Sequence, residues 1–290
     1  MRGLAIAGKA NLFEAAEGSA LLWSNTRARA ATQLTLFDLD FENTTLDGAV
    51  SDTLAAAAGG IRRQIVFVNA HVINTAASDP AYRDVLQAAD YRLSDGSGMA
   101  IAAKWAHVPF VNNTNGTDFF PLLCREAVKT GAKLFLLGGA PRVADLAAET
   151  IAAAGYGAAI AGTHHGFFKP GSTDENAAIA AINASGATIV LAGLGVPMQD
   201  VWLARNRSRI TAPVVAGVGG LFDFFAGRVS RAPLLLRSLG LEWTWRLMQE
   251  PRRLWQRYLV GNVTFLARAA VEASRHAAAR RQRALAVGKA

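Results

Sequence analysis

Short runs of apolar residues alternate with helix-like stretches along most of this chain, and this alternation limits the fold more than any other feature. Five of the runs are QIVFVNA (64–70), KLFLLGG (133–139), AAIAG (158–162), ATIVLAGLG (187–195) and APVVAGVGG (212–220). Each run has the length of a buried strand. Strands that are buried on both faces and joined through helices form parallel sheets. The sequence therefore predicts an α/β fold, with a mostly parallel sheet and helices on both of its faces.

The helices between these runs have recognisable ends. Asp79 followed by Pro80 marks the start of one helix, and Gly59 with Gly60 ends another. The expected helices run from 43–45 to about 58, over 80–90, from the 94–98 loop to 105, from 115–118 to 129, from 141 onward, over 174–184 and over 198–206. A further strand is expected at 34–41. Because no linker precedes residue 229, we predict one α/β domain over residues 34–228. A loosely ordered segment (1–33) precedes it, and a helical appendage (229–290) follows it.

The positive charge of the chain is concentrated in this appendage. The 290 residues carry a formal net charge of +8. From residue 229 onward, twelve Arg and Lys residues face three Glu residues, a net +9, so the remainder carries −1. Such asymmetry indicates an anionic partner, either a lipid surface or nucleic acid. A solvated tail that only improves solubility is the alternative.

The densest part of the appendage is residues 239–258, LGLEWTWRLMQEPRRLWQRY. It contains three Trp, one Tyr and four Arg, and Pro251 interrupts it. Aromatic and guanidinium groups together suit a surface that meets anionic phosphates, on a bilayer or on a diphosphate ligand. The alternative is an ordinary amphipathic helix whose tryptophans close a core. No run of eighteen uncharged apolar residues occurs, so no membrane-spanning helix is expected.

The compartment follows from weaker signals. The N-terminal residues make a poor signal peptide, because Lys9 and Glu14 interrupt their apolar patch. The single cysteine, Cys124, fits a reducing cytoplasm, and it is expected in the middle of a helix with its side chain in the protein core.

The predicted strands end in polar and glycine-rich loops, where open parallel sheets bind their ligands. These ends are Asn69, the 94–98 loop, Gly138 with Gly139, the 163–166 turn, 195–199 and 219–223. Glycine lets a ligand approach the backbone, and helix N-termini offer N–H groups to phosphate. None of the loops reads GxGxxG or GxxxxGKS, so a dinucleotide oxidoreductase and a P-loop nucleotidase are disfavoured.

Asp95 is the carboxylate best placed for chemistry, because it follows a strand and lies in a glycine-flanked turn. A carboxylate there could act as a general base. On spacing alone, an N-cap of the next helix is the better interpretation. Asp118 is likewise interpreted first as an N-cap.

The residues suggest no metal site. Asp38-Leu39-Asp40 resembles a metal-binding D-x-D sequence, but it lies on the first expected strand without a third ligand, so a structural role is favoured. His164 and His165 are adjacent, and in an extended segment they would point to opposite sides. No metal and no cofactor are therefore assigned.

Seven blocks of sequence occur in this order: DGSGMAIAAK (95–104), NGTDFFPLL (115–123), LFLLGG (134–139), GTHHGFF (162–168), GLGVPMQD (193–200), GVGGLFDFFAGRVSRAP (217–233) and LGLEWTWRLMQEPRRLWQRYL (239–259). Taken together, they resemble the WecG/TagA/CpsF glycosyltransferases over about residues 34–268. The resemblance implies a Rossmann-like domain with a C-terminal appendage that contacts the membrane and completes the active site. It implies an inverting, metal-independent transferase in surface polysaccharide or wall teichoic acid synthesis.

The resemblance also implies substrates and a location. The enzyme would move a sugar, typically N-acetylmannosamine, from a UDP donor to a sugar on a polyprenyl diphosphate. It would act in the cytoplasm, on the inner face of the cell membrane, and glucose is the second candidate for the sugar. The resemblance also implies that the protein can form homo-oligomers.

The family motifs assign roles to several positions. Asp95 matches the proposed catalytic base, and Asn69 matches the asparagine of the T-x-N motif. Gln199 matches the glutamine of G-x-P-x-Q-E, although Asp200 replaces the Glu, and Asp223 matches an aspartate expected to hold the ribose. The remaining expected substrate-binding residues are Arg246 and Arg253 at the leaving diphosphate, and Gly138, Gly139, Gly195, Asn113 and Thr117. Phe67 replaces the Thr of T-x-N and Asn113 replaces a frequent Arg, both near the expected cleft, which leaves the donor and acceptor sugars open.

Two other functions remain as alternatives. The first is a non-catalytic protein that binds a nucleotide or a lipid head group, in which Phe67 and Asn113 would mark the loss of activity. Nucleic-acid binding through the basic tail ranks last, because a membrane interface accounts better for the tryptophans.

Overall fold

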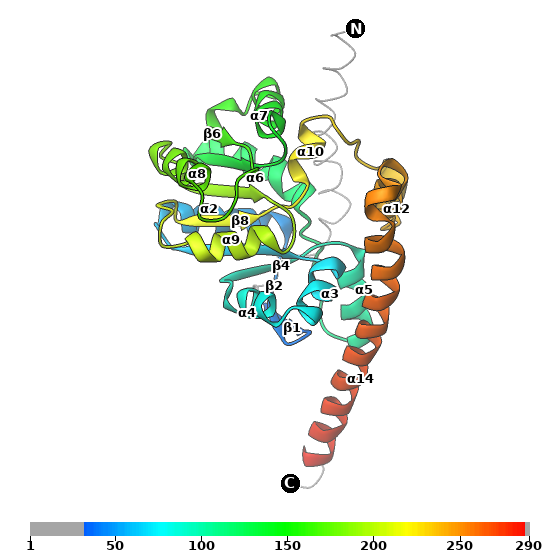
Figure 1. Ribbon diagram of the computed structural model, residues 1–290. Helices are drawn as coiled ribbons and strands as arrows, with labels where there is room; N and C mark the ends of the chain where they lie inside the picture. The colour runs from blue at the N-terminus through cyan, green and yellow to red at the C-terminus, as the bar shows by residue number, and fades with distance from the viewer. Residues whose placement is uncertain (1–31, 288–290) are drawn as a thin grey trace.

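A computed structural model describes residues 32–287 of the protein. Its centre is a six-stranded sheet in the order β4-β3-β8-β7-β5-β6 (Figure 1). The strands are β3 (Arg63–Val68), β4 (Tyr91–Ser94), β5 (Leu134–Gly138), β6 (Ile160–His164), β7 (Ile189–Gly193) and β8 (Val214–Gly217). Every neighbouring pair in this sheet is parallel. The predicted α/β fold is therefore confirmed.

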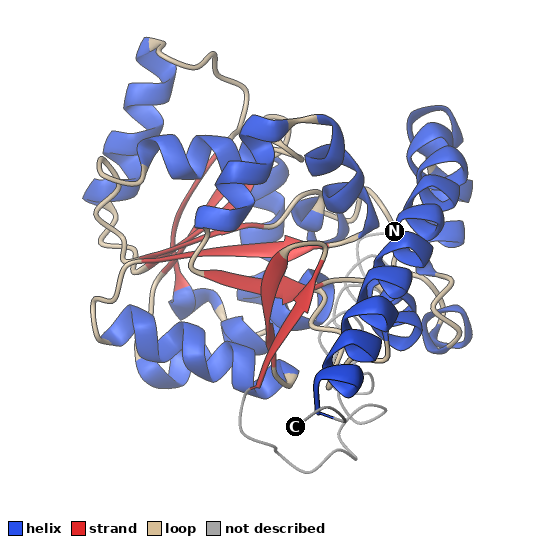
Figure 2. Cartoon of the chain, turned by 90° about the horizontal axis from the view of Figure 1, so that it is seen from below, coloured by secondary structure: helices blue, strands red, loops and turns tan. Residues whose placement is uncertain are grey.

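Helices cover both faces of the sheet because alternate strand residues point to opposite sides (Figure 2). In β3, Ile65 and Phe67 pack in one layer, whereas Val66 and Val68 pack in the other. The first layer contains α2 (Leu46–Ala58), α6 (Gly116–Thr130), α7 (Val143–Ala153) and α10 (Leu221–Phe225). The second layer contains α3 (Ala70–Ser78), α4 (Pro80–Ala88), α5 (Ser97–Ala106), α8 (Thr173–Ala184) and α9 (Met198–Asn206). Cys124 lies buried in α6, as expected.

The prediction of a single strand over residues 34–41 is wrong. The chain instead forms an antiparallel hairpin of β1 (Thr32–Leu36) and β2 (Leu39–Asn43). Phe37 and Asp38 form the two-residue turn, with φ of 56° and 60°. Positive φ at both turn residues matches the twist of a tight hairpin, but it is uncommon for these residue types. Asp38 therefore lies in an exposed turn, 3.9 Å from Arg275, and not on a strand.

Helix α3 was not expected between the strand at 64–70 and the helix at 80–90. Asn69 ends the strand by capping α3, because its side-chain Oδ1 accepts hydrogen bonds from the backbone N–H groups of His71 (3.1 Å) and Val72 (3.2 Å). Asp79 caps α4 in the same way, as expected. The bounds predicted for α9, residues 198–206, are confirmed.

After α10 the chain leaves the sheet and continues as a series of helices. These are α11 (Leu234–Ser238), α12 (Glu242–Gln249), α13 (Pro251–Trp255), a π-helical turn, η2 (Gln256–Val260), and the long α14 (Gly261–Val287). Phe265 and Ala269 of α14 are buried in the core layer that contains α3 and α5. The far end of α14 extends beyond the body of the protein (Figure 1). The expected appendage is thus helical, while its boundary at residue 229 stays a prediction. The expected N-terminal segment, 1–33, lies outside the described residues apart from its last two.

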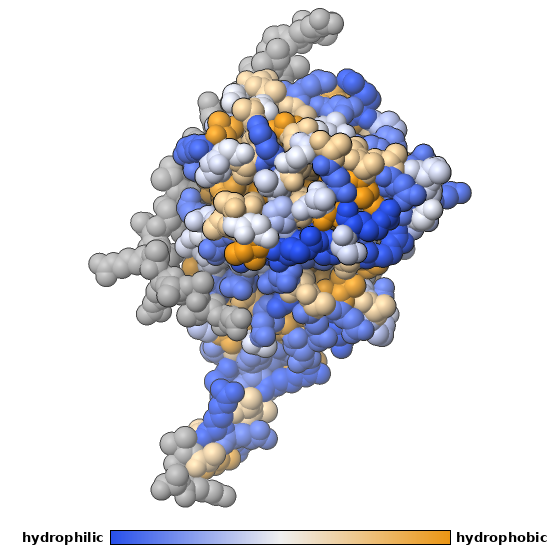
Figure 3. Space-filling model, turned by 90° about the vertical axis from the view of Figure 1, so that its left-hand side faces the viewer, coloured by the Kyte–Doolittle hydropathy of each residue, from blue (hydrophilic) through white to orange (hydrophobic). Residues whose placement is uncertain are grey.

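None of the described helices combines the length and the apolar composition that a bilayer crossing requires. On the face shown in Figure 3, apolar residues form small patches between polar ones, and the projecting end of α14 is mainly hydrophilic. Larger apolar side chains are exposed along the C-terminal helices. They include Leu235, Leu239, Met248, Trp255, Leu259, Val260 and Val263.

Candidate active site

The carboxyl end of the sheet brings Asn69 and Asp95 together. The Nδ2 amide of Asn69 donates a 2.9 Å hydrogen bond to Oδ2 of Asp95. The backbone N–H of Asp95 donates to the carbonyl of Val68, so both residues are tied to the end of β3. The interpretation of Asp95 as an N-cap is wrong, because α5 is capped at Gly96 without any side-chain hydrogen bond. The carboxylate of Asp95 is therefore available for chemistry.

The surroundings of Asp95 adjust its basicity. Burial raises the pKa of this carboxyl group, and the hydrogen bond from Asn69 and the charge of Arg257 only partly offset the increase. Burial and Arg257 also lower the pKa of His71, at the start of α3, to about 4, so this imidazole is neutral at physiological pH. A carboxylate with a raised pKa takes up protons more readily, as a general base must.

The loop around Asp95 is held from two sides. The Oδ1 atom of Asn113 accepts a 2.7 Å hydrogen bond from the N–H of Gly96, whose φ of 86° suits glycine. The hydroxyl of Ser97 donates a 3.0 Å bond to the carbonyl of Gly240, in the turn between α11 and α12. A Cβ atom on Gly240 would lie 2.9 Å from that of Ser97, so the two segments touch. The C-terminal helices therefore contact the loop that carries the candidate base.

Phe67 packs in the core layer that contains α6. The residue is 6% exposed, and its ring packs edge-on against Phe119, with ring centroids 5.2 Å apart. Its expected position near the substrate cleft stays a prediction. Asn113, in contrast, lies beside Asp95 through Gly96.

A buried ion cluster joins the start of α6 to the C-terminal helices. Oδ1 of Asp118 lies 2.5 Å from the guanidinium of Arg231 and 3.6 Å from that of Arg237. Glu242 lies 3.5 Å from Arg237 and 3.8 Å from Arg231. The side chains of Asp118, Arg231 and Arg237 are less than a tenth exposed. These charges compensate one another, so the cluster fastens α11 and α12 to the sheet domain.

Asn115 caps α6, so the interpretation of Asp118 as the N-cap is wrong. Oδ1 of Asn115 accepts from the N–H of Asp118 (2.9 Å) and from the hydroxyl of Thr117 (2.8 Å). The side chain of Asp118 is thereby left to pair with the arginines. The expected substrate contact of Thr117 stays a prediction.

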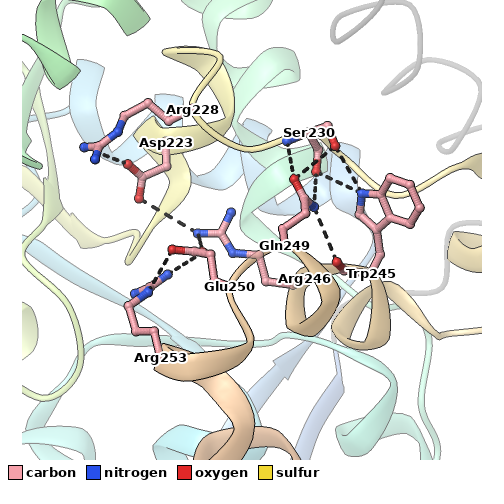
Figure 4. A network of polar contacts seen from close by, with 8 residues as sticks. All are labelled: Asp223, Arg228, Ser230, Trp245, Arg246, Gln249, Glu250 and Arg253. Carbon is pink, nitrogen blue, oxygen red and sulfur yellow. Dashed lines mark hydrogen bonds and ion pairs between the residues drawn. The ribbon is translucent and has the colours of Figure 1, made fainter.

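A second network of charges surrounds Asp223, in the first turn of α10 (Figure 4). Its carboxylate lies 3.6 Å from Arg228 and 3.9 Å from Arg246. Arg246 lies 2.9 Å from Glu250, which also pairs with Arg253 at 2.6 Å. The three residues predicted to contact the donor, Asp223, Arg246 and Arg253, thus belong to one network, which contains Glu250 as well.

Hydrogen bonds also join Ser230 to helix α12, which carries Arg246. The indole N–H of Trp245 donates to the Ser230 hydroxyl (3.2 Å), and the N–H of Ser230 donates to Oε1 of Gln249 (2.8 Å) (Figure 4). Helix α12 is therefore attached to the segment that follows Asp223.

Gln199 lies inside the protein. Its Oε1 accepts a 2.8 Å hydrogen bond from the N–H of Gly219, two residues after the end of β8, and Gln199 is 3% exposed. The neighbouring Asp200 is fully buried and accepts a 2.7 Å bond from the hydroxyl of Tyr82. Burial raises the pKa of Asp200 to about 6. Gln199 thus orders the loop after β8, while its expected contact with the nucleotide stays a prediction.

The glycines at the strand ends fall into two groups. At Gly138, a Cβ atom would lie 2.5 Å from the carbonyl oxygen of Gly193, and at Gly139 it would lie 2.7 Å from Val143. Gly138 is therefore needed for packing against the end of β7, and Gly139 for packing against the start of α7. At Gly195 and Gly219 the space around a Cβ atom is open, and φ is 82° and 57°. A ligand can approach the backbone more readily at the second pair.

His164 and His165 do not point apart, contrary to expectation. Their ring centroids are 4.5 Å apart, because β6 ends at His164 and the alternation of side chains stops there. Within residues 32–287, no group of three or more His, Cys, Asp or Glu side chains is placed to hold a metal ion.

Sequence reasoning missed Arg257, Glu250 and Gly240. Residues 246–257 contain four arginines, and nothing in their spacing tells which one acts through its charge on the carboxyl group of Asp95.

The sequence that forms this site also matches a known protein family. The model of the glycosyl transferase WecG/TagA/CpsF family matches residues 34–279, which includes the sheet, both charge networks and most of α14. The resemblance noted from the motifs is thereby confirmed. The chain belongs to the WecG/TagA/CpsF family, and it is a glycosyltransferase of cell-surface polysaccharide synthesis.

Proposed function

We propose that the protein transfers a sugar from a UDP-sugar to a sugar carried on a polyprenyl diphosphate. N-acetylmannosamine is the proposed sugar, and another hexose such as glucose is the second candidate. One observation carries the proposal: the arginine-rich segment after residue 229 meets the loop of Asp95. Ser97 bonds to Gly240 at 3.0 Å, and the charge of Arg257 acts on the Asp95 carboxyl group.

In the proposed reaction, Asp95 removes the proton from the acceptor hydroxyl. The resulting oxygen attacks the anomeric carbon from the side opposite to the diphosphate, and the bond to UDP breaks, so the configuration inverts. UDP leaves with the bonding electrons. Asn69 keeps the Asp95 carboxylate oriented through its 2.9 Å hydrogen bond.

Arg246 and Arg253 would stabilise the negative charge that develops on the leaving diphosphate. Charge-assisted hydrogen bonds from guanidinium groups suit this task, because they are strong and can bind two oxygens at once. Asp223 lies in the same network and would hold the ribose hydroxyls. The space around the backbone at Gly195 and Gly219 is open, which would leave room for the donor there.

We also propose that the C-terminal helices rest on the anionic inner surface of the cell membrane. Leu235 and Val263 are each 70% exposed, and Trp255 and Leu259 are about half exposed. Arg252 is exposed between them. An exposed apolar surface with interspersed arginines favours the interface of an anionic bilayer. Such docking would bring the reaction site to its lipid-linked acceptor.

A screen of donors and acceptors tests the proposed function. Purified protein is incubated with each of several UDP-sugars and with polyprenyl diphosphates that carry different first sugars. Transfer to one acceptor, with release of UDP, is the expected result. Binding of UDP without transfer for any pair would favour the non-catalytic alternative.

A further inference from the structure

Arg246 and Arg253 already hold an anion that belongs to the protein, the carboxylate of Glu250. Arg253 donates from Nε to one oxygen of Glu250 (2.9 Å) and from a terminal nitrogen to the other (2.6 Å). A terminal nitrogen of Arg246 lies 2.9 Å from the second oxygen (Figure 4). Guanidinium groups bind phosphate with the same two-point geometry. Glu250 therefore occupies one of the two edges through which the guanidinium of Arg253 could bind a diphosphate.

Glu250 can turn away from the arginines without disrupting a helix. It lies between α12 and α13, just before Pro251, with φ of −134° and ψ of 56°. Its side chain is 28% exposed. A residue at such a junction keeps more freedom than one within a helical turn.

Arg246, in contrast, is held in place. Its side chain is 11% exposed, and its guanidinium lies over the ring of Phe224, 4.8 Å from the centroid. Its Nη1 group is buried and has no hydrogen-bond partner among residues 32–287. Buried donors normally find an acceptor, so a ligand oxygen that reached this N–H group would satisfy it.

The charges of the network favour exchange of one anion for another. Two carboxylates, Asp223 and Glu250, face three guanidinium groups, those of Arg228, Arg246 and Arg253. Burial raises the pKa of Glu250, but the hydrogen bonds from Arg253 and the charge of Arg246 outweigh it, so its pKa lies below the usual range. Glu250 is therefore charged at neutral pH. A diphosphate beside it would bring like charges together, which is unfavourable.

We infer that Glu250 takes the place of the donor diphosphate in the ligand-free protein, and that the donor must displace it. This inference rests on the proposed function, because it assumes that Arg246 and Arg253 bind a diphosphate. Glu250 keeps the two guanidinium groups close together before the donor arrives. The same contacts weaken donor binding, since they must be broken.

The test is the substitution Glu250→Gln, which keeps the shape of the side chain and removes its charge. Calorimetry with inorganic pyrophosphate and with UDP should show about tenfold tighter binding than in the wild type, since a hydrogen bond to a charged group contributes at least about that factor. With an active donor, KM should fall while kcat does not rise. A purely structural role for Glu250 would not lower KM.

Glu126→Gln is the matched control. Glu126, in α6, also pairs with two basic residues, Arg125 at 3.0 Å and Lys129 at 2.8 Å, but lies in the later turns of its helix. Its substitution should leave both affinities unchanged. Equal or weaker binding in Glu250→Gln, with a wild type that binds, would overturn the inference and leave the proposed function standing. A wild type that binds neither pyrophosphate nor UDP would overturn both.

Discussion

The buried ion cluster around Asp118 predicts a large effect for one substitution, Asp118→Ala. The change removes the carboxylate that lies 2.5 Å from Arg231 and 3.6 Å from Arg237. Both guanidinium groups are less than a tenth exposed, and Glu242 is then the nearby carboxylate that remains. Removing one partner of a buried charge pair costs about 3–5 kcal/mol, because the other charge stays buried without compensation. That is a large part of the stability of a typical domain.

The assay has two parts. Urea denaturation of the full chain, followed by tryptophan fluorescence, gives the change in the free energy of unfolding. Hydrogen exchange of residues 231–249 shows whether α11 and α12 separate locally, which would limit the global loss. Glu149→Ala is the control, since Glu149 pairs with Arg142 at 3.3 Å on an exposed surface and should cost less than about 1 kcal/mol. A loss below about 1 kcal/mol in Asp118→Ala, with unchanged exchange in 231–249, would refute the reasoning.

Three further predictions concern pH, packing and the membrane. Transfer activity should fall as the pH drops through a value above the usual carboxyl range, because the pKa of Asp95 is raised. Arg257→Gln should move this acidic side of the kcat/KM profile to higher pH, because the charge of Arg257 lowers the pKa of Asp95. An unmoved acidic side would contradict the role of Arg257. Gly138→Ala should destabilise the protein by more than about 2 kcal/mol in urea titrations, whereas Gly116→Ala, in open space, should be nearly neutral. Equal effects would contradict the packing argument. Leu259→Glu should reduce sedimentation with anionic liposomes, and undiminished sedimentation would count against the proposed surface.

The parallel sheet could be predicted because its strands are apolar throughout and its helices have clear caps. Helix α9 has the predicted bounds, and Asp79 caps α4 as expected. The hairpin at 32–43 could not be predicted in the same way. Its turn places Phe37 and Asp38 at positive φ, which the sequence does not signal because neither residue is glycine. Tertiary packing of the two strands against β3 and α14 overrides the local preference.

Most residues of the candidate site could be predicted from the sequence, whereas the contacts between them could not. The resemblance pointed to Asp95 and Asn69, which lie 2.9 Å apart, while spacing alone favoured a helix cap. Glu250 was missed although Arg246 lies four residues before it and Arg253 three residues after it, a spacing at which charged side chains pair. The packing role of Gly138 was missed for a different reason, since the Gly193 carbonyl that it faces comes from another strand. Contacts between distant segments are decided by the tertiary structure and leave little trace in local sequence.

We propose that Asp95, in the loop that the C-terminal helices contact, is the base of a sugar transfer. The most direct measurement compares Asp95→Asn with the wild type, using the best donor and acceptor from the screen and measuring UDP affinity in parallel. We predict a loss in kcat of about 10²–10⁴-fold, the usual contribution of a general base, with UDP binding close to that of the wild type. A kcat within tenfold of the wild type would contradict the account.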